Sequence, residues 1–370
     1  MKNSTPRLIV AVSETDPDLL YATRFFAPDP FVFLEKEGRR VILLNDLELN
    51  RGRSQARVDE VVSHGEVAAR AGKGATFAAT IVRFLKEQRV RKARVPATFP
   101  LGLATELTKA GIALEPVNGL FFPEREIKTA EELRQLRHAL AITEAGLARA
   151  MEVLGAAKIG AANRLQWGNA TLTSERLRAE IDSAILRAGG LPANTIVAGG
   201  EQGCDPHEQG HGPLKAHSLI IMDIFPRDAR TGYYGDMTRT VVKGKASDAQ
   251  RRLWETVWEG QKRVLKTMKP GRDGKEIHDA LTAFFAERGY PTEQSKGRWT
   301  GFFHGTGHGL GLEIHEDPRF GRTRFKPGQV ITVEPGLYYP GLGGVRIEDV
   351  VTVTQTGIRM LSRFEKRLEV

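Results

Sequence analysis

The sequence predicts an α+β protein made of two domains, and three observations lead to that prediction. The chain has 370 residues, more than a single domain usually holds. Residues 1–122 alternate short strand-like runs with helix-like stretches, which is typical of a small α/β unit. From residue 123 the pattern changes to long helices separated by strand-like runs, which indicates helices on one face of a mixed, largely antiparallel sheet. We therefore place the domains at residues 1–122 and 123–370.

Three strand-like runs and one helix define the first domain. The strand-like runs are residues 8–12, 31–34 and 41–44, and residues 35–40 with Gly38 predict a hairpin connection between the last two. Residues 76–88 have a helical pattern. Because this half contains no cluster of histidines and carboxylates, we expect it to have a supporting or oligomerising role.

The second domain is predicted to open with a long helix that begins near Thr129, because apolar residues recur at helical spacing as far as Met151. Further helices are predicted at residues 174–188, 247–268 and 275–288, the second of them opened by a capping box of Ser247 with Gln250. Strand-like runs are predicted at residues 219–225, 237–242, 329–333 and 345–353.

Composition and charge exclude several classes of protein. The chain has no apolar stretch near the roughly 20 residues of a membrane span, and its N-terminus lacks the long apolar core of a secretory signal. Its net charge of +9 comes from basic residues scattered among acidic ones, which argues against nucleic-acid binding. Cys204 is the single cysteine, so an intrachain disulfide is excluded and a reducing cytoplasm fits best.

Carboxylates stand where buried strands should be apolar. Asp223 interrupts the run LIIMDIF, Glu334 closes QVITVEPG, and Glu348 lies within GGVRIEDVVTVT. A buried carboxylate costs several kcal/mol unless it is paired, hydrogen-bonded or bound to a metal. Arg346 and Glu348 would share a face of an extended chain, so a structural salt bridge between them is the simpler interpretation of that pair.

A fourth acid and three histidines extend this set. Strand alternation places Asp236 on the same side as the threonines that follow it in GYYGDMTRT. The segment FFHGTGHGLGLEIHEDP carries His304, His308 and His315 among four glycines, which argue against a helix and suit a backbone that packs closely. Three histidines beside four such carboxylates indicate a metal site.

The donor types define the metals that such a site can hold. Carboxylates and imidazoles without thiolates suit Mn²⁺, our first choice, or Co²⁺, Zn²⁺ or Fe²⁺. Four carboxylates are more than one catalytic ion usually takes, and carboxylates can bridge two ions ~3.5 to 4 Å apart. We therefore expect two divalent ions per chain.

In this order, the residues resemble those of the M24 metallopeptidase family, which includes aminopeptidase P, prolidase, methionine aminopeptidase and the metal-free creatinases. The likeness covers residues 124–365 in detail and the first domain in pattern only. It implies a small α/β creatinase-type N-terminal domain followed by a pita-bread catalytic domain. It also implies that Asp223 binds one ion and that His308 and Glu334 bind the other. Asp236 and Glu348 would bridge both ions.

The same resemblance assigns residues that act on the substrate. The run HGTGHGLGLEIHE looks like the bacterial proline-peptidase form of the histidine motif. There His304 and His315 match residues that contact substrate and stabilise the tetrahedral intermediate. Arg346 matches an arginine that orients Glu348.

Two segments depart from the family pattern. The spacing from His207 to Asp223 is shorter than usual, so His207 is our first candidate for a further substrate-site histidine and His211 the alternative. The chain between the two aspartate ligands is longer than usual and carries Arg227 and Arg230. Either arginine is a candidate cation for the free carboxylate of a dipeptide substrate.

The predicted function is an aminopeptidase P-like enzyme that hydrolyses Xaa-Pro bonds of small peptides, with Glu334 as general base and then acid. The alternative within the family is an Xaa-Pro dipeptidase, or prolidase. Methionine aminopeptidase is disfavoured because it lacks an N-terminal domain of this size. Relatives that have this domain pack it against a neighbouring subunit, so we expect a homodimer.

Three rival interpretations belong to other classes. Residues 207–211 satisfy the zincin pattern HExxH, but Gly210 and the glycine and proline that follow leave too little room for the helix that this motif needs. A metal-free pita-bread protein that only binds other proteins would typically lack the ligands, whereas all five are present. A creatinase-type amidinohydrolase is disfavoured for the same reason.

Overall fold

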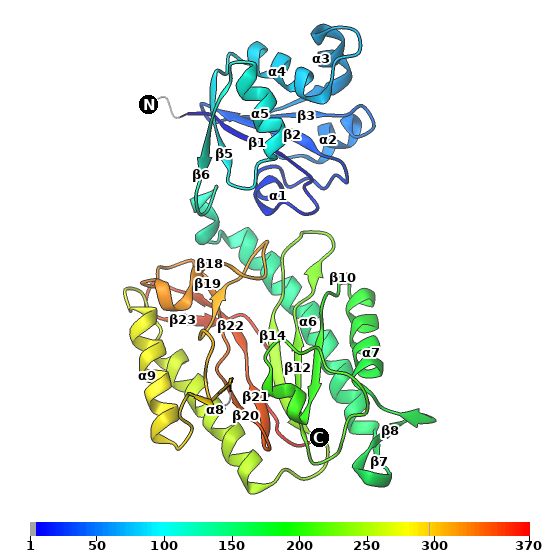
Figure 1. The fold of residues 1–370 in the computed structure, drawn as a ribbon, viewed down its shortest axis with the longest axis vertical. Helices are drawn as coiled ribbons and strands as arrows, with labels where there is room; N and C mark the ends of the chain where they lie inside the picture. Colours follow the sequence, from blue (N-terminus) through cyan, green and yellow to red (C-terminus); the bar gives the residue numbers. More distant parts are fainter. Residues whose placement is uncertain (1–4, 296) are drawn as a thin grey trace. The chain divides into compact units, whose positions relative to one another are not determined.

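The computed structural model describes residues 5–295 and 297–370 (Figure 1). Contacts divide the chain into two compact units, Met1–Arg125 and Glu126–Val370, close to the predicted boundary after residue 122. Within the described residues, none of the helices combines the length and the apolar character that crossing a bilayer requires.

The first unit is built on a six-stranded mixed sheet with the order β4-β3-β2-β1-β5-β6. Its strands are β1 (Arg7–Ala11), β2 (Phe31–Lys36), β3 (Arg39–Leu44), β4 (Glu60–Ser63), β5 (Lys92–Pro96) and β6 (Ala113–Val117). Its helices are α1 (Pro17–Thr23), α2 (Leu49–Gln55), α3 (His64–Ala71), α4 (Phe77–Glu87) and α5 (Leu101–Lys109).

Strand alternation explains why this sheet is buried on both faces. Leu8 and Val10 of β1 pack in one core with Ile81 of α4, whereas Ile9 packs on the opposite face with Leu19 of α1. Apolar runs of this kind are what a sheet covered on both sides requires.

Local sequence signals place the hairpin and the α4 boundaries where we predicted them. Strands β2 and β3 pair antiparallel, and the two residues between them, Glu37 and Gly38, both have positive φ, as a tight hairpin turn requires. Helix α4 begins after Thr76, whose hydroxyl accepts the backbone N–H of Ala79. Both predictions are confirmed.

The second unit carries its strands in several small sheets. The strands are β7 (Lys158–Ile159), β8 (Leu165–Trp167), β9 (Ala170–Thr171), β10 (Gly190–Leu191), β11 (Ile196–Gly199), β12 (Leu219–Ile224), β13 (Arg227–Asp228), β14 (Met237–Val242), β15 (Glu293–Ser295), β16 (Arg298–Thr300), β17 (His308–Gly309), β18 (Glu316–Arg319), β19 (Val330–Val333), β20 (Gly336–Tyr339), β21 (Gly343–Arg346), β22 (Asp349–Val353) and β23 (Ile358–Met360). Two sheets carry most of the site, one with the order β11-β12-β14 and one with the order β18-β17-β19-β22-β23.

Four helices support these sheets: α6 (Ala130–Ala156), α7 (Ser174–Arg187), α8 (Asp248–Thr267) and α9 (Gly274–Glu287). Helix α6 packs on β12 and β14, and α8 packs on β19, β20 and β21 (Figure 1). Capping boxes open α6 at Thr129 and α8 at Ser247, as the sequence predicts for α8. The apolar faces of α8 and α9 close the larger core against β19 and β22.

One predicted strand is wrong. Residues 345–353 do not form a single strand, because the chain leaves the β20–β21 pair after Arg346 and enters β22 at Asp349. The backbone N–H of Glu348 instead donates to the carbonyl of Thr238, 3.1 Å away. The break therefore lies at Glu348, one of the predicted metal ligands.

Candidate metal centre and active site

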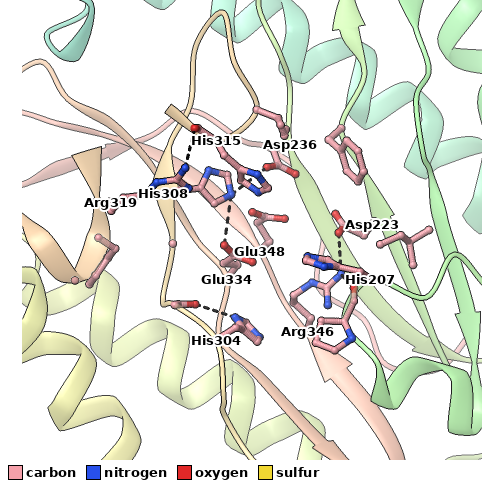
Figure 2. Close-up of a pocket in the computed structure, with 18 of the residues that line it drawn as sticks. His207, Asp223, Asp236, His304, His308, His315, Arg319, Glu334, Arg346 and Glu348 are labelled. Carbon is pink, nitrogen blue, oxygen red and sulfur yellow. Dashed lines mark hydrogen bonds and ion pairs between the residues drawn. The ribbon is translucent and has the colours of Figure 1, made fainter. Parts of the chain in front are cut away.

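A cavity of about 810 Å³ in the second unit is lined by all the site residues predicted from the sequence. These are His207, Asp223, Asp236, His304, His308, His315, Glu334, Arg346 and Glu348. Figure 2 shows Glu348 between Asp223 on one side and His308 on the other. The structure thus brings together residues that are up to 141 positions apart (348 − 207).

The β12–β14 pair positions the two aspartates. Asp223 of β12 stands opposite Thr238 of β14, and Asp236 immediately precedes β14. Gly235 lies so close to α6 that a Cβ atom there would be 2.5 Å from the Ala139 carbonyl oxygen. Glycine at this position therefore lets Asp236 enter the cavity directly beside the helix.

The glycine-rich histidine segment lies against β19. At Gly307 a Cβ atom would be 1.9 Å from the carbonyl oxygen of Thr332, so a side chain has no room there. The backbone N–H of His308 donates to Thr332 Oγ1, and that of Glu334 donates to the carbonyl of Thr306. Close backbone packing, which the glycines predict, is confirmed.

The hydrogen bond of His308 determines which ring nitrogen faces the cavity. Nδ1 lies 3.1 Å from the carbonyl of Gly309, which can only accept, so Nδ1 carries the proton. Nε2 then presents a lone pair 3.4 Å from Glu334 Oε1 and 3.6 Å from Asp236 Oδ2. Burial lowers the pKa of His308 to about 3, so the imidazole stays neutral and does not itself offset the carboxylate charges beside it. A cation between them would.

Three ligand atoms are close enough for one ion. Atoms of Asp236, His308 and Glu348 all lie within 4.8 Å of one another, and all three residues are buried. Thr238 Oγ1 is 2.9 Å from both Asp223 Oδ1 and Glu348 Oε2, so it connects Asp223 to this group of three ligands. Glu348 Oε1 is buried without a hydrogen-bond partner in the described chain. That orphaned oxygen fits a metal ligand.

The carboxylates also raise one another's pKa. Burial, and then the charges of Glu348 and Asp223, raise the pKa of Asp236 well above its usual value. Burial raises the pKa of Glu334 to about 8. Buried like charges need a compensating cation, so the donor set fits divalent metal ions.

The family follows from the sequence of the same unit. Residues 134–355 match the model of metallopeptidase family M24. The chain belongs to metallopeptidase family M24. The predicted family is therefore confirmed.

Relatives of this M24 chain include the Xaa-Pro dipeptidase of Pyrococcus furiosus, which is 35% identical over 251 residues. That match covers 66% of this chain and 65% of the relative. The structure of the Xaa-Pro dipeptidase from Bacillus anthracis superposes with a TM-score of 0.82 at 26% identity, covering 99% of this chain and 95% of that one. The X-Pro aminopeptidase from Thermotoga maritima MSB8 also gives a TM-score of 0.82, at 22% identity, covering 98% and 97% of the two chains. The predicted fold, a small α/β N-terminal domain followed by a pita-bread domain, is confirmed.

The arginine of the M24 site has a different partner from the predicted one. Arg346 Nη2 donates to Asp223 Oδ2 over 2.7 Å, and among the described residues no ion pair joins Arg346 to Glu348. The strand ends between Arg346 and Glu348, so the two side chains do not share an extended face. Their common neighbour is Thr238, whose hydroxyl lies 3.3 Å from Arg346 Nε. Arg346 thus contacts Asp223 directly and reaches Glu348 through Thr238, and its role in orienting Glu348 stays a prediction.

Tyr338 is a site residue that the sequence analysis missed. It is fully buried, and its hydroxyl accepts from Arg346 Nη1 at 3.0 Å. His304 Nδ1 donates to the carbonyl of Gly305, so Nε2 accepts from Tyr338, 2.8 Å away. Burial, and then the charge of Arg346, lower the pKa of His304 to about 3, so its ring is neutral. Tyr338 comes near Arg346 because β20 pairs with β21, and alternation along the chain does not predict that pairing.

The two histidines that the sequence left as alternatives lie apart. His207 lines the cavity, whereas His211 lines a different cavity and has 73% of its side chain exposed. The five residues 207–211 form no helix, and Gly210 has φ +82°. The geometry favours His207 and removes the zincin alternative.

The arginines that reach the cavity are not those of the lengthened loop. Arg227 lies on β13, which pairs with β10, and its Nε donates to the carbonyl of Gly232 in its own turn. Arg227 and Arg230 are not among the cavity-lining residues, so their prediction as carboxylate-binding cations is corrected. Arg319 and Arg322 line the cavity instead, and Arg319 Nη2 donates to the carbonyl of His315 at 3.1 Å (Figure 2).

Proposed function

We propose that this protein is a metal-dependent Xaa-Pro dipeptidase. The observation that carries the proposal is a buried group of carboxylates and an imidazole in a cavity whose lining also holds two exposed cationic side chains, Arg319 and Arg322. A dipeptide needs a cation for its free carboxylate, whereas a longer peptide needs an open exit. The dipeptidase alternative is therefore better supported than the aminopeptidase P-like function that the sequence favours, and the printed names of two relatives agree with it.

The metal site is proposed to hold two divalent ions, with Mn²⁺ as the first choice and Co²⁺, Zn²⁺ or Fe²⁺ as alternatives. Asp223 would serve one ion, His308 and Glu334 the other, and Asp236 and Glu348 both. When bound, such ions lower the pKa of water and polarise the substrate carbonyl. Metal analysis of the purified protein should find two ions per chain, and one ion or none would contradict this site.

Several side chains of the cavity would have separate roles in the hydrolysis of the peptide bond. Glu334 would take the proton of the attacking water and return it to the leaving proline nitrogen, which has no amide proton of its own. His315 is exposed at the cavity beside His308, with ring centroids 4.4 Å apart, so it can donate to the developing oxyanion. His207 and the neutral His304 would help to hold the substrate.

The test compares kcat/KM on an Xaa-Pro dipeptide with kcat/KM on an Xaa-Pro-Yaa tripeptide of the same first residue. We expect the wild type to prefer the dipeptide. Arg319→Ala should lose about 10- to 100-fold on the dipeptide, mainly through KM, because a hydrogen bond to a charged group contributes about 1.5–3 kcal/mol.

Arg230→Ala is the matched control, because Arg230 is exposed and lies outside the cavity lining. It should leave both substrates unaffected. A wild type that strongly prefers the tripeptide would establish the aminopeptidase P-like function instead. If the protein cleaves neither peptide with Mn²⁺ present, the result would favour the alternative of a metal-free pita-bread protein that only binds other proteins.

We further propose a reducing, cytoplasmic location, which the single, buried cysteine supports. Fractionation of cells that express the tagged protein should recover it in the cytosolic fraction. Recovery from the medium or from a membrane fraction would contradict the proposal.

A further inference from the structure

Gln261, in the interior of α8, reaches the backbone beside two of the predicted metal ligands. Its side chain is completely buried, and its Nε2 donates to the carbonyl of Val333 at 3.0 Å and to that of Ile347 at 3.1 Å. Val333 immediately precedes Glu334, and Ile347 immediately precedes Glu348. One amide group thus joins the two segments that carry these glutamates.

Both acceptors are carbonyl oxygens, so the amide must present its nitrogen, and both of its protons are used. The other amide atom, Gln261 Oε1, is buried with no hydrogen-bond partner within the described residues. An unsatisfied buried acceptor costs about 1–3 kcal/mol. The surroundings are apolar, with Val257 and Val264 of α8 in the same core as Val333. Packing alone would therefore favour an apolar side chain here. The two donated hydrogen bonds are the feature that a glutamine, and not an apolar side chain, supplies at this position.

The two carbonyls lie where regular strand pairing ends. Val333 is the last residue of β19, and Ile347 lies in the break between β21 and β22. To bind metal ions the adjacent carboxyl groups must be ionised, and two buried like charges repel each other and would separate their segments. A hydrogen-bonded clamp from a rigid helix opposes that separation.

We propose that Gln261 is a positioning residue that holds the Glu334 and Glu348 backbones at the spacing needed to bind two divalent ions. The inference rests on the two-metal site proposed above. Gln261 touches neither the ions nor the substrate, and it acts through the two carbonyls. Its removal should weaken metal binding before it unfolds the protein.

The experiment uses Gln261→Met, which nearly preserves the side-chain volume but removes both donors. Mn²⁺ binding to the chelator-stripped full-length protein is measured by calorimetry, with circular dichroism and Tm as checks of folding. We expect at least one of the two Mn²⁺ sites to weaken about 10-fold or more, because residues that orient ligands typically contribute 10- to 100-fold to metal affinity.

Gln250→Met is the matched control on the same helix. Gln250 is buried, and its Nε2 donates to the carbonyl of His217, a residue outside the lining of the metal cavity. The control also loses its capping-box contact to Ser247, so its Tm should fall, but its Mn²⁺ affinity should equal that of the wild type. If Tm falls in both variants but Mn²⁺ affinity falls only in Gln261→Met, the loss of metal affinity comes from the position of the ligands and not from lower stability.

Wild-type Mn²⁺ affinity in Gln261→Met would overturn the proposal, and so would an equal loss in Gln250→Met. If Gln261→Met does not fold, Gln261→Glu, which has the same shape and can donate at most one proton, replaces it with the same expectation. If neither variant folds, Gln261 is required for folding itself, and the proposal is overturned. Since the titration contains no peptide, a wild type that binds two ions but cleaves no Xaa-Pro bond would reject the proposed activity and leave this inference standing.

Discussion

At the scale of single residues, Glu334 is the carboxylate best placed for proton transfer. Its Oε1 faces His308 Nε2 in the cavity, and burial raises its pKa to about 8. We expect Glu334→Gln to lower kcat by about 10²–10⁴-fold with the fold intact, because the amide keeps the shape but cannot accept and return a proton. Steady-state kinetics with Mn²⁺ present measure this. Glu255→Gln, an exposed position on α8, is the control, and near-normal turnover of Glu334→Gln would reject the assignment.

Cys204 gives a second prediction at this scale. The residue is 6% exposed, and burial raises the pKa of its thiol to about 11. At pH 8 the thiol is therefore protonated and enclosed, so the native protein should not react with a disulfide reagent such as DTNB over minutes. In denaturant one thiol per chain should react, because unfolding restores the ordinary pKa and access. Rapid reaction of the native protein would contradict the buried position.

At the scale of elements, an ion pair joins the start of α6 to the segment that carries His315. Lys128 Nζ lies 2.5 Å from Glu316 Oε1, and each side chain is 2% exposed. Glu316 also accepts the backbone N–H groups of Leu312 and Glu313, which shapes the turn before His315. The pair therefore links the helix to one wall of the cavity.

Lys128→Met should destabilise the protein by about 3–5 kcal/mol, because it removes the buried cation that faces the Glu316 carboxylate. The double variant Lys128→Met with Glu316→Leu should regain part of that stability. Its kcat/KM should fall below that of Lys128→Met, because Glu316→Leu removes the acceptor of the backbone N–H groups of Leu312 and Glu313 before His315. Urea unfolding and dipeptide kinetics measure the two effects.

Lys326→Met provides the comparison for this pair. Lys326 pairs with Glu126 at the surface, with 59% of its side chain exposed, so its loss should cost less than about 1 kcal/mol. If Lys128→Met were no more destabilising than Lys326→Met, the buried pair would have no structural role.

At the scale of the whole molecule, we predict a homodimer. The predicted site residues all belong to the second unit, so the first unit has no assigned chemistry, and the family resemblance implies that this unit packs against a neighbouring subunit. Light scattering at working concentration should give twice the chain mass of 40.9 kDa. The mass of a single chain would refute the prediction.

The sequence alone determined the features that depend on neighbouring residues. The capping box at Ser247 and the start of α4 follow from side chains that bond to backbone three positions away. The Glu37–Gly38 turn follows from the positive φ that glycine readily adopts. The carboxylates in apolar strands were also readable, since a charge in a buried strand is costly wherever it occurs. These local signals, with the family resemblance, identified nine of the residues that line the cavity.

Only the tertiary structure decided which distant groups meet. Three features join distant segments, by up to 123 positions in the contact of Arg346 with Asp223. The other two are the position of Arg319, rather than Arg227, in the cavity lining and the hydrogen bonds of Gln261 to the carbonyls beside Glu334 and Glu348. Strand alternation predicts a face but not the point where the strand breaks, so the single strand 345–353 and the shared face of Arg346 and Glu348 were both wrong. Local rules leave these contacts open because they follow from the packing of several sheets on α6 and α8, which no single segment encodes.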